Sequence, residues 1–350
     1  MNAPRSAPTL PDQPDDWTAP GAYPVAAAVW RIPLPLPSTG LRAVNVYAAE
    51  GPDGIVLVDA GWSDPVGLAA LRHGLGEIGR ALDDVARVVV THAHHDHYTQ
   101  AVDLRARCGA TIALGRGERH TVEAFARTPG DPPQPGMLRR AGAPRLADEM
   151  ARVAEQSLAL DTAPWGAPDR WLDHREEVAV GPRAVEVLAT PGHTRGHVAL
   201  RDPGAGALFA GDHVLPHITP SIGYERAPEP APLRSFLDSL RLVGDLPETL
   251  LLPAHGPVTV GVRTRVDELL AHHEQRLAEA AGHVRDGAST GYGVAARMRW
   301  TRREKRLDEL ETEHAALAVL EIVAHLDLLV EREVLAAAEE DGVVRYAARR

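Results

Sequence analysis

The feature that most constrains this chain is a cluster of ligand-type side chains directly after a short apolar run. Residues 91–97 read THAHHDH and follow the three valines of residues 88–90. His92, His94, Asp96 and His97 therefore stand together at the end of an expected buried strand. Imidazole and carboxylate groups crowded at such a position lose hydration, and a bound cation would compensate for that loss. Zinc, iron and manganese all accept these ligands, so the cluster predicts a metal site.

Short apolar runs alternate with helical patterns along most of the chain. We expect strands near residues 25–30, 43–47, 54–61, 87–91, 111–114, 183–190, 197–201, 207–210 and 249–252. Helices are expected over 65–80, 96–107, 116–127, 144–160, 231–244 and 262–285. This alternation, without a Gly-x-Gly-x-x-Gly phosphate loop, predicts a layered α/β fold and argues against a dinucleotide-binding domain.

Three segments depart from this pattern and suggest the domain boundaries. Residues 1–22 are rich in proline and aspartate and are expected to form a disordered tail, so the main domain spans 23–287. Residues 128–175 interrupt that domain with several prolines, and form either a lid over a pocket or a surface excursion. Residues 288–350 combine a long helix over 307–330 with two short strands around 334–335 and 343–346, which predicts a small winged-helix-like domain.

Further ligand-type residues follow other expected strands. His193, Asp212 and His255 each stand in a loop that contains glycine or proline, directly after an apolar run. Side chains that converge from several strand ends onto one rim of a sheet are the usual basis of a catalytic site. We therefore expect these three residues to join the first cluster.

The ordered set of motifs resembles the metallo-β-lactamase fold superfamily of hydrolases over about residues 25–285. The resemblance is carried by Asp59 in the segment VDAG, by the HxHxDH motif of residues 92–97, and by the three later ligand residues. It implies an αββα sandwich, followed here by the winged-helix-like unit.

The same resemblance implies a complete site for two divalent metal ions, zinc in the first place, with iron or manganese as alternatives. One ion is held by His92, His94 and His193; the other is held by Asp96, His97 and His255; Asp212 lies between the two. It also implies that Asp59 supports the ligands from outside, and that a hydroxide bridging the metals is the nucleophile. Asp96 is the catalytic candidate that orients this hydroxide.

The substrate is less constrained, because the superfamily acts on β-lactams, thioesters, phosphodiesters and lactones. Residues 215–223 and 265–276, together with the C-terminal unit, look like the β-lactamase-like protein 2 group, which includes thioesterases of polyketide pathways. We therefore favour hydrolysis of a thioester or ester of a small metabolite. The candidate residues facing the substrate are His217, Tyr224, Trp165 and Trp171.

Two other functions stay open at this point. Residues 297–306 carry six cationic side chains and one tryptophan, which could grip single-stranded RNA, although the net charge of −11 opposes binding to nucleic acid. Iron-dependent sulfur or oxygen chemistry would use the same ligands.

Composition and termini bound the location of the protein. Cys108 is the only cysteine, so no disulfide can form within the chain. The N-terminus has no apolar leader and no apolar stretch is long enough to span a membrane, so we expect a cytoplasmic protein. The apolar face of helix 307–330 makes a homo-dimer an open alternative to a DNA-reading role.

Overall fold

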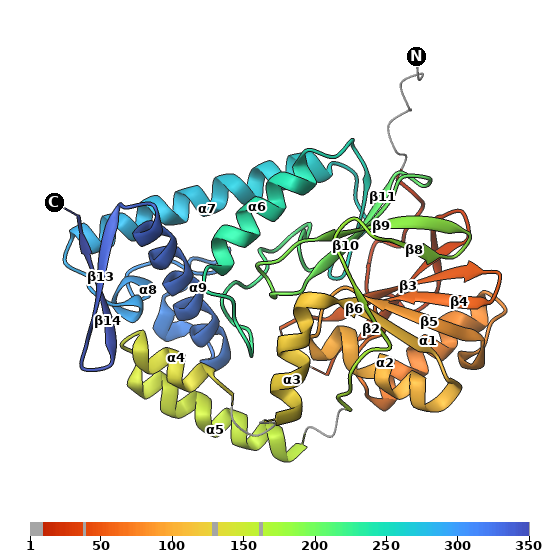
Figure 1. Ribbon diagram of the computed structural model, residues 1–350, viewed down its shortest axis with the longest axis horizontal. Helices are drawn as coiled ribbons and strands as arrows, with labels where there is room; N and C mark the ends of the chain where they lie inside the picture. Colours follow the sequence, from red (N-terminus) through yellow and green to blue (C-terminus); the bar gives the residue numbers. More distant parts are fainter. Residues whose placement is uncertain (1–9, 38–39, 128–131, 161–163, 350) are drawn as a thin grey trace.

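The computed structural model describes residues 10–37, 40–127, 132–160 and 164–349 (Figure 1). The first nine residues of the expected tail, and residues 128–131 and 161–163 of the expected insertion, lie outside this description. Part of the remaining tail lies against the first sheet, where the buried guanidinium of Arg31 donates to the side chain of Gln13 and to the carbonyl of Trp17.

One sheet carries the first half of the chain. Its seven strands lie in sequence order: β1 (Tyr23–Ala26), β2 (Val29–Pro35), β3 (Ala43–Gly51), β4 (Gly54–Val58), β5 (Val85–Val90), β6 (Thr111–Gly115) and β7 (Arg170–Leu172). The pairs from β1 to β4 are antiparallel, and those from β4 to β7 are parallel. The single strand expected over residues 25–30 is wrong. The chain reverses there because Ala28 adopts a left-handed conformation, with φ 57°, and forms a β1–β2 hairpin.

The second sheet has five strands in the order β12-β11-β10-β9-β8. They are β8 (Glu177–Val180), β9 (Arg183–Ala189), β10 (Val198–Asp202), β11 (Ala207–Gly211) and β12 (Leu250–Pro253). Only the β11–β12 pair is parallel among these neighbours.

The two sheets pack face to face between two helical layers. Tyr47, Val89, Val187 and Phe209 belong to the apolar core between the sheets. Helices α1 (Pro65–Glu77), α2 (His95–Cys108) and α3 (Arg119–Arg127) contribute to a second core with the first sheet. Helices α6 (Pro232–Gly244) and α7 (Val262–Arg285) bury their apolar faces in a third core with the second sheet. This is the αββα layering, and it brings the carboxyl ends of β5, β9, β11 and β12 to one rim.

The insertion and the C-terminal unit pack against each other, as Figure 1 shows at the end of the molecule away from the sheets. Helices α4 (Gln134–Arg140) and α5 (Pro144–Leu160) contact α9 (Thr312–Glu331), and the short helix α8 (Gly291–Ala295) also contacts α9. Strands β13 (Leu335–Glu340) and β14 (Val343–Ala348) form the expected terminal hairpin. Three short 3-10 turns complete the described elements: η1 (Leu82–Asp84), η2 (Arg116–Glu118) and η3 (Leu307–Glu309).

Helix α9 also packs against α6 and α7, so its apolar face is covered within the chain. At the α7 contact, His273 Nδ1 lies 3.1 Å from His325 Nε2, and His325 Nδ1 lies 2.7 Å from the Glu321 carbonyl. These contacts place His273 in the packing of α7 against α9. Within the described residues, no helix is long and apolar enough to cross a membrane.

Candidate metal centre

The seven ligand-type residues converge at the shared rim of the two sheets. His92 and His94 lie in the loop between β5 and α2, while Asp96 and His97 stand in the first turn of α2. His193 follows β9, Asp212 follows β11, and His255 follows β12. Each position is therefore set by the end of a buried strand, which explains how residues far apart in sequence meet.

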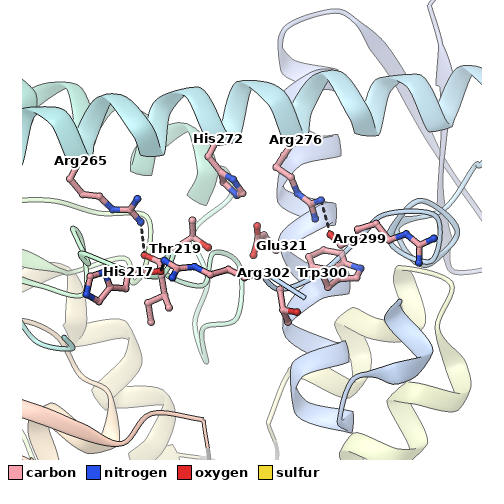
Figure 2. A pocket seen from close by; sticks show the side chains of 11 residues that line it. His217, Thr219, Arg265, His272, Arg276, Arg299, Trp300, Arg302 and Glu321 are labelled. Carbon is pink, nitrogen blue, oxygen red and sulfur yellow. Dashed lines mark hydrogen bonds between the residues drawn. The ribbon is translucent and has the colours of Figure 1, made fainter. Parts of the chain in front are cut away.

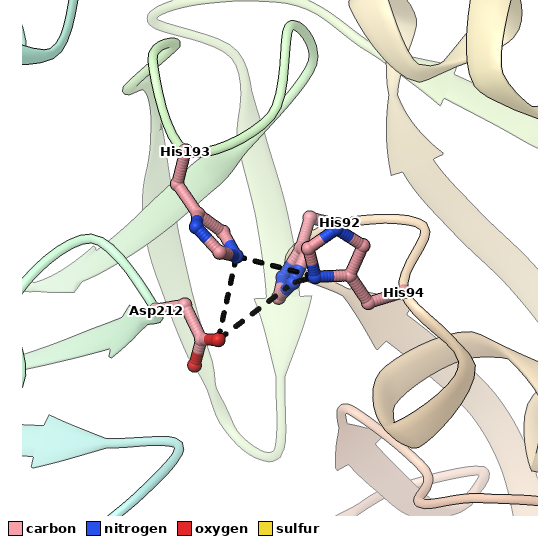
Figure 3. Close-up of side chains that lie close together, drawn as sticks. All are labelled: His92, His94, His193 and Asp212. Carbon is pink, nitrogen blue, oxygen red and sulfur yellow. Dashed lines mark hydrogen bonds and ion pairs between the residues drawn. The ribbon is translucent and has the colours of Figure 1, made fainter. Parts of the chain in front are cut away.

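Four of these side chains form the first group of possible ligands, and Figure 3 shows them pointing toward one another. His94 Nδ1 lies 2.9 Å from His92 Nε2 and 3.2 Å from His193 Nε2. Asp212 Oδ2 lies 3.4 Å from His193 Nε2 and 4.0 Å from His92 Nε2. His94 therefore offers its Nδ1 atom to the group, whereas the other two histidines offer Nε2.

The remaining three residues form a second group beside the first. Asp96 Oδ2 lies 3.7 Å from His97 Nε2 and 3.4 Å from His255 Nε2. The other oxygen of Asp212, Oδ1, lies 3.7 Å from His97 Nε2 and 3.4 Å from His255 Nε2. One carboxylate oxygen of Asp212 thus faces each group, as expected of a residue between two ions.

Unpartnered buried atoms indicate that the site suits cations. Among the described residues, His97 Nε2, His255 Nε2 and Asp212 Oδ1 are buried and have no hydrogen-bond partner. Such atoms cost free energy unless another group satisfies them. These three face the same space, and a divalent ion would bind all of them.

The opposite nitrogens of the rings are held by the protein. His193 Nδ1 donates to the Ser221 carbonyl and His255 Nδ1 donates to the Ala43 carbonyl, each at 2.8 Å. An N–H donated on one side of an imidazole leaves a lone pair on the other, which is the tautomer a metal ligand needs. The residues present therefore fit a pair of divalent metal ions.

The pKa values of the histidines at the rim also indicate a site that suits cations. Burial, together with the neighbouring His193, lowers the pKa of His94 to about 3, and burial with His97 and His94 lowers the pKa of His92 well below its usual range. Both rings are therefore neutral near pH 7. Burial also acts to lower the pKa of His97, but the carboxylates of Asp96, Asp59 and Asp212 outweigh it and raise that pKa to about 10. The carboxylates thus favour positive charge at the centre of the site.

Asp59 lies where an outer support of the ligands is expected. Its Oδ2 atom is 2.9 Å from His97 Nδ1, and its Oδ1 atom accepts the Thr91 N–H at 2.8 Å. The residue is buried and has a left-handed backbone, with φ 60°. A non-glycine residue in that region costs about 1–3 kcal/mol unless its surroundings hold it, which these hydrogen bonds do.

Several residues outside the expected set also position the ligands. The backbone N–H of Asp212 donates to His197 Nε2 at 3.1 Å, and His197 Nδ1 lies 2.8 Å from Thr190 Oγ1. Gly211 must be glycine, because its φ is 52° and an added Cβ would lie 2.5 Å from His197 Nε2. The place of His197 beside a ligand motif is too weak a signal to predict this role.

A cavity of about 440 Å³ opens beside the two groups and includes His94 and Asp96 in its wall. Aromatic rings line the same cavity: Phe125 and Trp165 stack with ring centroids 3.7 Å apart, and Trp62 stacks on His95 at 5.0 Å. Neither Phe125, Trp62 nor His95 was among the candidates from the sequence.

The four candidate substrate-facing residues fall in different places. Tyr224 and Trp165 line this cavity. Trp171 instead lies in β7 and packs against the core beneath α2, while His217 lines a separate cavity. Glu225, which the sequence did not single out, lies in the cavity wall, where burial and then the nearby Glu118 raise its pKa to about 8.

The basic segment 297–306 does not present a stacking surface. Trp300 is only 9% exposed, and its indole N–H donates to the Ala295 carbonyl at 3.0 Å. The guanidinium of Arg276 lies over its ring at 4.4 Å. Arg297 donates to the Asp286 carbonyl, and Arg306 pairs with Asp308 at 3.2 Å. The RNA-binding alternative therefore lacks its aromatic stacking platform.

Residues 39–255 match the family model of the "Metallo-beta-lactamase superfamily", which is more than half of the chain. The chain belongs to the metallo-β-lactamase superfamily. It is 22% identical over 339 residues to the "Probable metallo-hydrolase YqjP" of Bacillus subtilis, covering 90% of this chain and 96% of that relative. It is 32% identical over 230 residues to a "Hydroxyacylglutathione hydrolase" of Acidiphilium cryptum, covering 65% and 73%.

The likeness to superfamily members extends past the family-model match into the C-terminal unit. A "Beta-lactamase domain protein from Burkholderia ambifaria" superposes with a TM-score of 0.81 at 28% identity, covering 97% of this chain and 96% of that structure. Like its relatives, this member of the superfamily is a metallo-hydrolase, and its metal-binding site consists of histidine and aspartate side chains.

Proposed function

We propose that this metallo-hydrolase holds two divalent ions, zinc in the first place, and hydrolyses the thioester of a small metabolite. The observation that carries the proposal is the opening of the metal-ligand groups onto a cavity that His94 and Asp96 line together with the aromatic rings of Phe125 and Trp165. An apolar acyl group and a hydrolytic centre would then meet in one space.

The ligand residues supply the positions of the ions. His92, His94 and His193 would hold one, Asp96, His97 and His255 the other, and Asp212 would contact both. When bound, such ions activate a water molecule and polarise the carbonyl oxygen of the substrate. Asp96 lies in the cavity wall, and the fields of His97 and His255 outweigh its burial and lower its pKa, so it is an ionised acceptor that can orient the attacking water.

The leaving group favours a thioester over an alkyl ester. A thiol has an ordinary pKa of about 8.5, so a thiolate leaves near neutral pH with little help from a proton donor. The similarity to a hydroxyacylglutathione hydrolase, which by its name cleaves an acylated glutathione, supports the same class of substrate. The buried state of Trp300 removes the main support for the alternative on RNA.

A panel of acyl-coenzyme A and acylglutathione substrates of increasing acyl length, assayed by thiol release with zinc-, manganese- or iron-loaded protein, tests the proposal. We expect turnover that needs metal, and a KM for the longest acyl groups that Trp165→Leu raises by about tenfold, because a buried contact of this kind contributes on the order of 1.5 kcal/mol. Trp171→Leu is the matched control and should leave that KM unchanged, since Trp171 lies outside the cavity.

Two results would count against this proposal. Thiol release no faster than in the metal-free control, for every substrate, would exclude thioester hydrolysis. Metal-dependent cleavage of single-stranded RNA, or activity found only with iron and an oxidant, would favour one of the alternatives instead.

A further inference from the structure

A second cavity of about 650 Å³ lies away from the metal centre and shares none of its lining residues. Figure 2 shows Arg265, His272 and Arg276 descending into it from α7. Arg302, from the segment after α8, extends toward the loop that carries His217. The volume falls in the range of about 300–1,000 Å³ usual for small-molecule sites.

Four arginines line this space in a protein whose net charge is −11. We call it the arginine cavity, after Arg265, Arg276, Arg299 and Arg302. Among the described residues, Arg299 and Arg302 form no ion pair of 4.0 Å or less. Arg265 pairs with Glu268 at 2.8 Å, but that carboxylate is 58% exposed and well screened by solvent. Arg276 approaches Glu279 at 3.4 Å. The walls of the cavity thus carry a local excess of positive charge.

All three side-chain nitrogens of Arg265 already donate, to the Leu215 and Ile218 carbonyls and to Glu268, but Arg276 and Arg302 keep donors free. Arg302 donates from one terminal nitrogen to the His217 carbonyl, and Arg276 donates from one terminal nitrogen to the Arg299 carbonyl at 3.2 Å. A guanidinium has five N–H groups, so both retain donors for another partner. Guanidinium forks match the oxygens of phosphate and of carboxylate groups, and can bind either with two parallel hydrogen bonds.

The remaining wall does not cancel this charge. Glu321 lines the cavity from α9, and burial raises the pKa of its carboxyl to about 7, so near neutral pH a large fraction is uncharged. His272 adds a neutral ring, because burial and then Arg276 lower its pKa. The side chains facing the cavity therefore offer hydrogen-bond donors beside cations.

We propose that the arginine cavity binds a phosphorylated small molecule. A nucleic-acid strand fits less well, because Trp300 is buried under Arg276 and the rest of the protein is acidic. The site does not depend on the hydrolytic reaction.

The cavity is nevertheless connected to the metal centre through one loop. Thr219 lines the cavity, and two residues later the Ser221 carbonyl accepts the N–H of the ligand residue His193 at 2.8 Å. The phosphate could therefore belong to the carrier part of a substrate or to a separate ligand, and the two sources share one chemistry.

Calorimetric titration of the metal-loaded protein with inorganic phosphate and with adenosine 3′,5′-bisphosphate tests the proposal, with adenosine as the uncharged control. Because phosphates also bind metal ions, the decisive comparison is between Arg302→Ala and Arg303→Ala, two neighbouring exposed arginines of which only Arg302 lines the cavity. We expect Arg302→Ala to weaken binding of at least one phosphate probe by about tenfold or more, since a charge-assisted hydrogen bond is lost, and Arg303→Ala to change it less than twofold.

Binding of neither probe, or equal affinities in the two variants, would overturn the proposal. Arg276→Gln gives an independent check if Arg302→Ala melts at a lower temperature than the wild type. The source of the phosphate follows from kinetics. If it is part of the substrate, Arg302→Ala raises the KM for an acyl-coenzyme A but not for the acylglutathione with the same acyl group. If it is a separate ligand, Arg302→Ala leaves both KM values unchanged and removes only the binding of the free bisphosphate.

Discussion

Replacement of Asp59 by asparagine should weaken one of the two proposed metal sites and spare the other. The Asp59 carboxylate holds His97 Nδ1 at 2.9 Å with one oxygen and accepts the Thr91 N–H with the other at 2.8 Å. In Asp59→Asn, the amide oxygen can still accept from Thr91, which turns the amide NH₂ toward His97. Two donors then face each other, and His97 can relieve the clash only by moving its proton to Nε2. That nitrogen is the one aimed at Asp96 and Asp212.

The expected magnitude follows from this tautomer change. Loss of a partner that orients a ligating histidine typically weakens metal binding about 10- to 100-fold. At about 1.4 kcal/mol per factor of ten, this corresponds to roughly 1.4–2.8 kcal/mol. The loss should fall on the site of Asp96, His97 and His255, whereas the site of His92, His94 and His193 should keep its affinity.

Competition of the protein with a chromophoric zinc chelator, analysed as two binding steps, measures both affinities. Asp64→Asn is the matched control. The Asp64 carboxylate caps α1 by accepting two backbone N–H groups at 2.8 and 3.0 Å, and asparagine caps helices equally well. Wild-type affinity at both steps in Asp59→Asn, or an equal loss at both, would refute the tautomer argument.

The remaining predictions concern packing, protonation and metal removal. Gly196→Ala should lower the free energy of unfolding by more than about 3 kcal/mol, because the added Cβ would lie 1.9 Å from the Glu118 backbone nitrogen. Gly136→Ala has open space around the added Cβ and should change the free energy of unfolding by less than about 1 kcal/mol. Urea denaturation of the two variants measures both values. Glu321 has a folded pKa of about 7, above the unfolded value of 4.5, so the folded state binds more protons between these pH values. Wild-type stability should therefore fall relative to Glu321→Gln as pH rises through that window, and a melting-temperature difference that stays constant would contradict the assignment. Chelation should lower the melting temperature and added zinc should restore it, by an amount that grows with free zinc; an unchanged melting curve would show that the site holds no ion in the folded protein.

The sequence predicts which ligand-type residues come together, because each of them is marked locally. A ligand such as His193 or His255 stands directly after an apolar run, and strand ends of a layered α/β fold meet at one rim. The position of each residue along its strand therefore determines where it lies in space. Asp59 follows the same rule, at the end of β4.

Other features depend on contacts that no local pattern contains. Trp165 and Trp171 are equivalent in the sequence and both pack against the core of the first sheet, but only Trp165 also lines the cavity. The hairpin at Ala28 needs a left-handed alanine, which propensity does not predict. The arginine cavity exists because α7 and the segment around Arg302 are brought together in the fold, although the sequence places them in different units.

A count of the metal ions in active protein decides whether a two-ion centre performs the hydrolysis. Zinc per chain should be measured by mass spectrometry together with thioester turnover, in the wild type and in His255→Ala. We expect two ions per chain in the wild type, and one ion with at least a hundredfold loss of turnover in His255→Ala, since His255 belongs only to the second group. Fully active wild-type protein with a single ion, or two ions and full turnover retained in His255→Ala, would contradict this expectation.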